Sequence, residues 1–212
     1  MMLHRDKALT KEEQAKLTPL QVLQDFIEGN TRFLNRKVHT IDHEKLISQT
    51  TTGQYPKAIV LSCIDSRVPV ELIFDQTIGD IFVARVAGNF ENTDILGSME
   101  FSCKVAGSKL VFVLGHESCG AIQAACDHVE MGNITAMLDN IQPAVHKSKS
   151  EVSGAYNSSN TDFVNQTIQN NVLLTIDRIR EKSPILKEME DNGEIKIVGG
   201  VYHLSNGKVS LH

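Results

Sequence analysis

Short apolar runs that alternate with helix-like segments constrain the fold of this chain more than any other feature of its sequence. Residues 58–62 form a continuous run of the kind seen in strands that are buried on both faces. The further predicted strands cover residues 80–87 and 109–114, and the predicted helices cover residues 69–74, 93–105 and 119–131. This alternation favours an α/β fold with a parallel sheet and crossover helices.

An amphipathic helix is predicted before this alternation, over residues 18–37. Thr18 is a suitable N-cap, and Pro19 is favoured in the first turn of a helix. The apolar face of the helix is broad and includes residues spaced three and four apart. Two packing arrangements therefore remain open, one on the core of the same chain and the other on a partner subunit.

The C-terminal part of the chain predicts a long helix followed by a hairpin. The helix covers residues 163–182, and the two strands cover residues 195–204 and 208–211. Between the strands, Ser205-Asn206-Gly207 contains the Asn-Gly pair that is typical of tight hairpin turns. Residues 147–162 are polar and predict a surface loop. Too little sequence follows this loop for a second core, so we expect a single domain over residues 1–212.

Composition and charge narrow the range of partners. The 212 residues carry a net charge of −5 with no basic stripe, which argues against nucleic-acid binding. The longest apolar stretches have only a few residues, whereas a membrane-spanning helix needs about 20, so no membrane contact is expected. Residues 1–7 lack the apolar core of a signal peptide. We therefore expect a cytoplasmic location, where four cysteines are poor candidates for disulfides.

Two of the predicted strands end in side chains that can bind a metal. Cys63 follows the first strand, and His116 and Cys119 follow the third. Because ligands bind beyond the carboxyl ends of parallel strands, we expect these three side chains to lie close together. Two thiolates and one imidazole suit Zn²⁺, and three protein ligands leave a fourth position open. The sequence therefore predicts one zinc ion per chain, although each cysteine taken alone could also be a core residue.

Asp65 and Arg67 stand two residues apart just beyond the first predicted strand. A bidentate pair would keep Asp65 ionised and fix its orientation, so that it could accept a hydrogen from a zinc-bound water. The same spacing also allows a plain structural ion pair. The remaining cysteines, Cys103 and Cys126, lie inside apolar helical patterns and are interpreted as structural.

Together these residues resemble the motifs of the β-class carbonic anhydrases, namely Cys63-x-Asp65-Ser66-Arg67 and His116-x-x-Cys119. The resemblance extends over about residues 20–207. The other matching stretches are Gly29-Asn30-x-Arg32-Phe33, Gln54, residues 79–85 and 87–89, and Ser98-Met99-Glu100-Phe101. It implies a mainly parallel sheet with an antiparallel edge, flanking helices and an N-terminal helical arm. This arm, residues 1–40, would contact a partner subunit.

The resemblance also implies an activity, the reversible hydration of CO2 to bicarbonate and a proton by zinc-bound hydroxide. Cys63, His116 and Cys119 would bind Zn²⁺, and Asp65 with Arg67 would form the catalytic pair. The substrate-binding positions implied in the same way are Gln54, Phe82, Ala87, Phe101 and the backbone of Gly120. The active sites would lie at the interface of a homodimer, which assembles further into a dimer of dimers in some members.

Other readings remain open at this point. The same scaffold could hydrolyse COS or CS2, or Cys63 and Cys119 could belong to a non-catalytic zinc-binding or redox-sensing protein. Family members also differ in whether the aspartate stays paired or closes onto zinc, which makes Asp65 a conditional fourth ligand. Val60 replaces the tryptophan that accompanies the closed form, whereas Tyr202 could match a tyrosine of its bicarbonate pocket. We expect the open form, with Asp65 paired to arginine.

Overall fold

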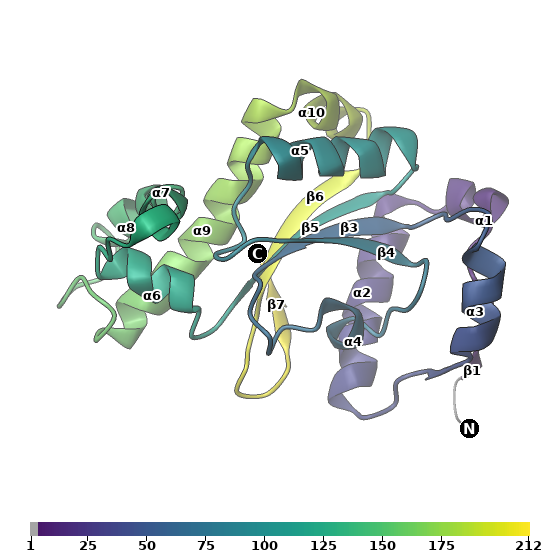
Figure 1. Ribbon diagram of the computed structural model, residues 1–212, viewed down its shortest axis with the longest axis horizontal. Coiled ribbons are helices and arrows are strands. Elements are labelled where there is room, and N and C mark those ends of the chain that lie inside the picture. Colours follow the sequence, from purple (N-terminus) through teal and green to yellow (C-terminus); the bar gives the residue numbers. More distant parts are fainter. Residues whose placement is uncertain (1–3) are drawn as a thin grey trace.

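A five-stranded β-sheet forms the centre of the computed structural model, which describes residues 4–212 (Figure 1). The strands lie in the order β4-β3-β5-β6-β7, and β7 alone runs antiparallel to its neighbour. Their bounds are β3 (Ala58–Ser62), β4 (Ile81–Arg85), β5 (Leu110–His116), β6 (Lys196–Tyr202) and β7 (Val209–Leu211). The expected α/β fold, with a mainly parallel sheet and an antiparallel edge, is confirmed.

Helices cover both faces of the sheet, because successive strand residues point to opposite sides. In β3, Ala58 and Val60 pack under α2 and α4, whereas Ile59 and Leu61 join the core beneath α5, α9 and α10. These helices are α2 (Pro19–Leu34), α4 (Val70–Ile73), α5 (Thr93–Glu100), α9 (Thr161–Lys182) and α10 (Pro184–Asp191). Within residues 4–212, no helix has the length and apolar character needed to cross a membrane.

Shorter elements complete the fold. They are α1 (Lys11–Lys16), α3 (His43–Thr50), a π-helix (Phe101–Val105), α6 (Gly120–Cys126), α7 (Gly132–Asp139), α8 (Gln142–Ser148), and the parallel pair β1 (His4–Arg5) and β2 (Thr40–Ile41). The π-helix continues α5, so the helix predicted over residues 93–105 is present with a wider last turn. The helix predicted over residues 119–131 ends at Cys126 instead. His128 has a left-handed backbone, with φ at 52°, which a right-handed helix cannot contain.

Helix α2 packs one side on the sheet of its own chain. Thr18 caps it as expected, and it ends at Leu34, before Arg36 adopts a left-handed φ of 55°. Val22 and Phe26 are buried against the sheet of the same chain. Its outer side still exposes the apolar side chains of Leu20 and Ile27. Residues 1–3 of the expected arm lie outside the described part of the chain.

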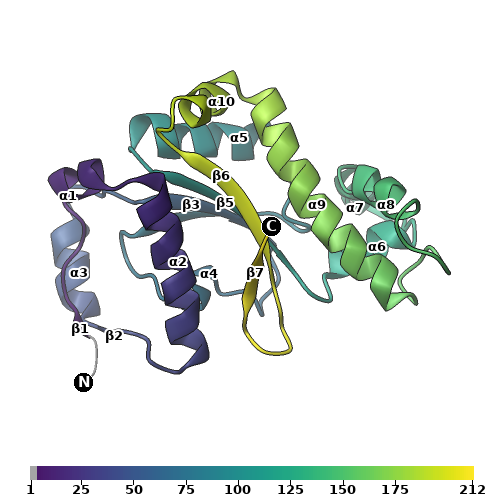
Figure 2. The same ribbon diagram turned by 180° about the vertical axis from the view of Figure 1, so that it is seen from behind.

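The predicted C-terminal hairpin joins β6 to β7 and extends between α2 and α9 (Figure 1, Figure 2). Its turn is closed by the N–H of His203, which donates to the carbonyl of Lys208 at 2.8 Å. Asn30 of α2 fastens the hairpin from one side: its amide nitrogen lies 3.0 Å from the carbonyl of Gly207, and its Oδ1 accepts the Val209 N–H at 2.9 Å. The position of the hairpin is therefore fixed by contacts outside the sheet ladder.

Candidate active site

Three potential metal ligands meet at the carboxyl edge of the parallel sheet. Cys63 directly follows β3, His116 ends β5, and Cys119 lies just before α6. β3 and β5 are neighbouring parallel strands, so both deliver their last residues to the same edge. The ligand atoms of the three buried side chains all lie within 4.8 Å of one another. Among residues 4–212, this is the only such group of histidine, cysteine and acidic side chains.

The donor geometry of this group fits a tetrahedral metal ion. The two sulfur atoms are 3.9 Å apart, and tetrahedral zinc with Zn–S bonds of about 2.3 Å requires a separation of roughly 3.8 Å. The Nδ1 of His116 lies 2.8 Å from the carbonyl oxygen of Glu117 and donates to it, which leaves Nε2 as the lone-pair nitrogen. Nε2 is buried and has no hydrogen-bond partner among the described residues. A bound cation would satisfy it.

In the protein alone, ionisation of one thiol of the cluster opposes ionisation of the other, because the two sulfur atoms are only 3.9 Å apart. The hydrogen bond from Cys119 lowers the pKa of Cys63 to about 4, and His116 and the N–H of Gly88 also favour this thiolate. The same contact, together with burial, raises the pKa of Cys119 far above its usual range. A divalent cation between the sulfurs would remove this conflict, because it stabilises both thiolates.

Asp65 and Arg67 form a bidentate ion pair beside the cluster. The Nε of Arg67 lies 2.9 Å from Oδ1 of Asp65, and Nη2 lies 2.7 Å from Oδ2. These hydrogen bonds hold the pKa of Asp65 well below its usual range. Oδ2 is 4.0 Å from Nε2 of His116. An ionised carboxylate therefore faces the space where a metal would bind, and in this structure it is paired with arginine.

Arg85 is a supporting residue whose role the sequence analysis missed. Its Nε donates to the carbonyl of Cys63 at 2.8 Å, and its Nη2 donates to the carbonyl of Asp65 at 2.6 Å. It thus holds the backbone on both sides of Ile64. Its place as the last residue of β4, a strand that ends at the same edge, is the signal that could have identified it.

The positions implied for substrate binding come from several separate elements, β4, the π-helix, the loop after β4 and the start of α6. Phe82 and Phe101 contact each other edge-to-face with ring centroids 6.3 Å apart, and Phe101 is 54% exposed. Ala87 precedes Gly88, whose N–H reaches Cys63. Beside Gly120 the space is open, since an added Cβ would meet no heavy atom within 4 Å.

Gln54 is not part of this group within one chain. It lies in the exposed turn before β3, whereas the cluster lies beyond the other end of that strand. The remaining cysteines also lie apart from the cluster, Cys103 in the π-helix and Cys126 at the end of α6. Burial raises the pKa of Cys103 to about 12, so it stays a thiol.

Comparison with known proteins places these features in a family. A family model described as carbonic anhydrase matches residues 58–209. Carbonic anhydrase 2 of Mycobacterium tuberculosis is 32% identical over 202 residues, which cover 91% of this chain and 92% of that protein. Carbonic anhydrase of Mycolicibacterium smegmatis is 29% identical and covers 91% of this chain and 93% of its own length.

Solved structures agree at the level of the fold. The β-carbonic anhydrase CafA of Aspergillus fumigatus superimposes with a TM-score of 0.70 at 24% identity, over 81% of this chain and 82% of that one. A tetrameric β-carbonic anhydrase of Sordaria macrospora gives a TM-score of 0.71 at 20% identity, over 90% and 96% of the two chains. With the motifs, the cluster and the family match taken together, this chain belongs to the β-class carbonic anhydrases.

Proposed function

We propose that this chain catalyses the reversible hydration of CO2 to bicarbonate and a proton, with one zinc ion held by Cys63, His116 and Cys119. The observation that carries the proposal is the juxtaposition of two kinds of group. Three buried donors have a spacing that suits zinc, and an ionised Asp65 lies 4.0 Å from the unpartnered nitrogen of His116. A metal site and a fixed hydrogen-bond acceptor therefore adjoin the same small space.

When bound, zinc would act as a Lewis acid that lowers the pKa of a water molecule. Asp65 accepts a hydrogen bond from the reacting water. This contact directs a lone pair of the water oxygen toward CO2. Arg67 keeps this acceptor ionised and fixes its plane through two parallel hydrogen bonds. Arg85 holds the backbone of the turn, so the acceptor cannot drift from the ligands. The resting form proposed here is the open one, in which Asp65 is not a metal ligand.

The substrate side of the site is proposed from the same residues that resemble the family. Phe82, Ala87 and Phe101 offer apolar surface for CO2, and the open space beside Gly120 leaves room for a small molecule. Gln54 would orient substrate only from a second subunit, because its own strand separates it from the cluster of its own chain.

A homo-oligomer therefore follows from the proposed role of Gln54. The exposed apolar side chains of Leu20, Ile27 and Phe101 are candidates for burial in a homodimer, with residues 1–40 as an arm against the partner. A dimer of dimers is the next assembly, as in the tetrameric relatives of Sordaria macrospora. We also propose a cytoplasmic location, because the four cysteines are free thiols suited to a reducing compartment.

The test combines metal analysis, stopped-flow CO2 hydration and light scattering on one preparation of the full chain. We expect one zinc per chain, rapid hydration that is lost with the metal, and a dimer or tetramer. Assays with COS and CS2 provide the substrate control. Zinc binding without CO2 hydration, or faster turnover of either sulfur compound, would overturn the proposed reaction.

A further inference from the structure

The turn between His116, at the end of β5, and Cys119, just before α6, contains two backbone carbonyls that contact groups of the site. The carbonyl of Glu117 accepts the hydrogen bond from Nδ1 of His116 at 2.8 Å. The carbonyl of the next residue, Ser118, accepts a hydrogen bond from Nη2 of Arg67 at 3.2 Å. Two successive carbonyls therefore orient a ligand ring and the arginine that pairs with Asp65.

This turn does not have a relaxed backbone. Ser118 has a φ of 52°, in the left-handed region that side chains other than glycine rarely occupy. A residue in that region persists when surrounding contacts hold it there. The position of the two carbonyls therefore depends on whatever fixes the turn from outside.

The side chain of Glu117 supplies this outside contact. Its Oε1 accepts a hydrogen bond from Nδ1 of His203 at 2.6 Å, and its Oε2 lies 3.3 Å from both the N–H and the hydroxyl of Ser205. The backbone N–H of Glu117 also donates to the carbonyl of Tyr202 at 3.0 Å. The second ring nitrogen of His203 is held by the hydroxyl of Ser210 at 2.9 Å, so the ring has one fixed orientation.

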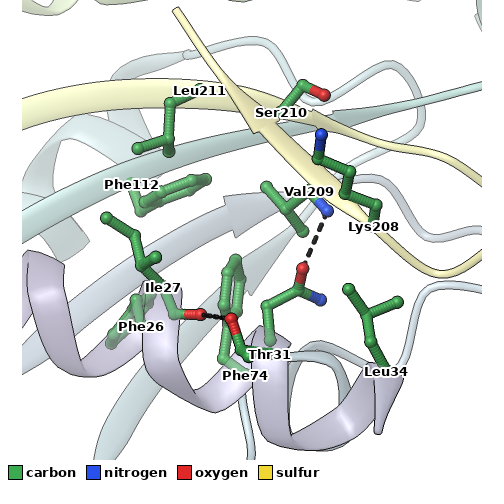
Figure 3. A pocket seen from close by; sticks show the side chains of 11 residues that line it. Phe26, Ile27, Thr31, Leu34, Phe74, Phe112, Lys208, Val209, Ser210 and Leu211 are labelled. Carbon is green, nitrogen blue, oxygen red and sulfur yellow. Dashed lines mark hydrogen bonds between the residues drawn. The ribbon is translucent and has the colours of Figure 1, made fainter.

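The hairpin that carries His203 is itself held without help from the turn. Asn30 binds it from α2, as described above, and Val209 and Leu211 on β7 face α2 across an apolar pocket (Figure 3). The pocket measures about 390 Å³ and is floored by buried phenylalanines that include Phe74 and Phe112. The hairpin can therefore act as a fixed support for the turn.

We infer that Glu117 and His203 are positioning residues of the metal centre. Through the carboxylate–imidazole contact they hold the backbone of the turn, and through its carbonyls they orient the ring of His116 and the guanidinium of Arg67. Neither side chain touches the reacting atoms. The inference rests on the proposed zinc site, and it adds a dependence of that site on the C-terminal hairpin.

The experiment compares His203→Ala and His203→Asn in the full chain, with Arg180→Ala as the matched control. Asparagine keeps a side-chain donor for Glu117. Arg180 forms a similar clamp at the opposite end of β6, where it binds Glu190 at 2.7 and 3.0 Å and the carbonyl of Ile197 at 3.1 Å. The readouts are zinc release to a chelator, the visible spectrum of the cobalt(II)-loaded protein, and kcat and KM for CO2.

Loss of outer contacts to a ligand typically weakens metal binding or activity by about 10–100-fold, and the lower end applies to a contact relayed through a turn. For His203→Ala we expect zinc release about tenfold faster, an altered cobalt spectrum, and a lower kcat with little change in KM. His203→Asn should recover most of each loss, and Arg180→Ala should leave release and spectrum as in the wild type.

Unchanged zinc release and an unchanged cobalt spectrum in a folded His203→Ala protein would overturn the inference, as would equal effects in Arg180→Ala. If His203→Ala does not fold, Glu117→Gln serves in its place, because the amide weakens the contact and preserves the shape of the side chain. If the wild type binds zinc but does not hydrate CO2, the release and spectral readouts still decide the inference. Failure of the proposed reaction can thereby be distinguished from failure of the inference about Glu117 and His203.

Discussion

The turns that follow β3 and β5 bring metal ligands to the same edge of the sheet, but they are held in different ways. In the β3 turn, Asp65 is bound by the side chain and N–H of Arg67, and its carbonyl accepts the Val68 N–H at 3.1 Å. In the β5 turn, the partners of the Glu117 side chain lie 86 and 88 residues further along the chain. The side chain of Asp65 is thus held by a residue two positions away, whereas the side chain of Glu117 is held by the C-terminal hairpin of the finished fold.

This difference predicts that the two turns respond differently to substitutions. The Asp65–Arg67 pair forms within one turn, so it should be sensitive to changes in its own few residues and in Arg85, which binds the carbonyls of Cys63 and Asp65. A turn that is held from a distance is also sensitive to changes in the element that holds it. Variants in the two turns therefore test the comparison, and the expected effects span several orders of magnitude.

The largest effect is expected for the ligands, which both turns share. Cys63→Ser, His116→Ala and Cys119→Ser should each lose most of the bound zinc, because two ligands cannot hold the ion as three do. Cys103→Ser, a buried thiol outside the cluster, should keep one zinc per chain. Metal analysis of the purified proteins measures this directly. Full occupancy in all three ligand variants would mean that the metal binds elsewhere.

The next effect concerns the local turn alone. Asp65→Asn should keep its zinc but lose CO2 hydration by about 10²–10³-fold, the usual cost of removing one oriented electrostatic contact. The amide cannot act as the ionised acceptor, and it breaks the bidentate pair. Asp191→Asn, at an exposed helix end, is the control and should hydrate CO2 like the wild type. Stopped-flow assays of CO2 hydration on samples with equal zinc content measure the effect. Near-normal activity of Asp65→Asn would show that Asp65 is not catalytic.

The acid titration of Asp65 gives a smaller effect with a definite sign. Hydrogen bonds from Arg67 lower its pKa in the folded protein, so the pair should persist below the unfolded value of about 3.9 and be lost only as the pH falls through the folded pKa. In Arg67→Ala, the pKa should move up toward that unfolded value. A carboxyl NMR titration between about pH 3 and 6 checks both proteins. Equal Asp65 titration curves in the two would rule out the pair as its cause.

The smallest effect is expected at the strained residue of the β5 turn. Ser118→Val should lower the free energy of unfolding by about 1–2 kcal/mol, since a branched side chain fits poorly at positive φ. Ser118→Gly should change it by less than about 1 kcal/mol, because relief of strain and greater flexibility of the unfolded chain oppose each other. Denaturant titration measures both. A valine variant as stable as the glycine variant would show that the turn has relaxed.

Local patterns in the sequence predicted the sheet and the ligands well. The apolar runs of β3 and β5, the C-terminal hairpin and the capped α2 each depend on neighbouring residues, and all are present, although residues 203–208 make the hairpin loop longer than a tight Asn-Gly turn. The ligands and Asp65 could be identified because they stand directly after strands, where a parallel sheet gathers functional groups.

The features that were missed are short helices and contacts between distant segments. The short helices α1, α3, α7, α8 and α10 have six to eight residues, too few for a periodic apolar pattern to be decisive. Arg85 binds carbonyls of a neighbouring strand, and Glu117 binds a hairpin far along the chain. No pattern within a short window records such contacts.

The strand order also has a consequence for the synthesis of the protein on the ribosome. β3, β4 and β5 lie within residues 58–116, so two of the three metal ligands and the first three strands of the five-stranded sheet emerge together. β6 begins only at Lys196, and until it arrives one side of β5, whose seven residues are all buried in the finished fold, has no neighbouring strand. An apolar strand with a free edge pairs readily with other chains. The nascent chain therefore exposes ligand residues before the sheet is complete. Until β6 is made, the unpaired edge of β5 is the surface that a chaperone would be expected to cover.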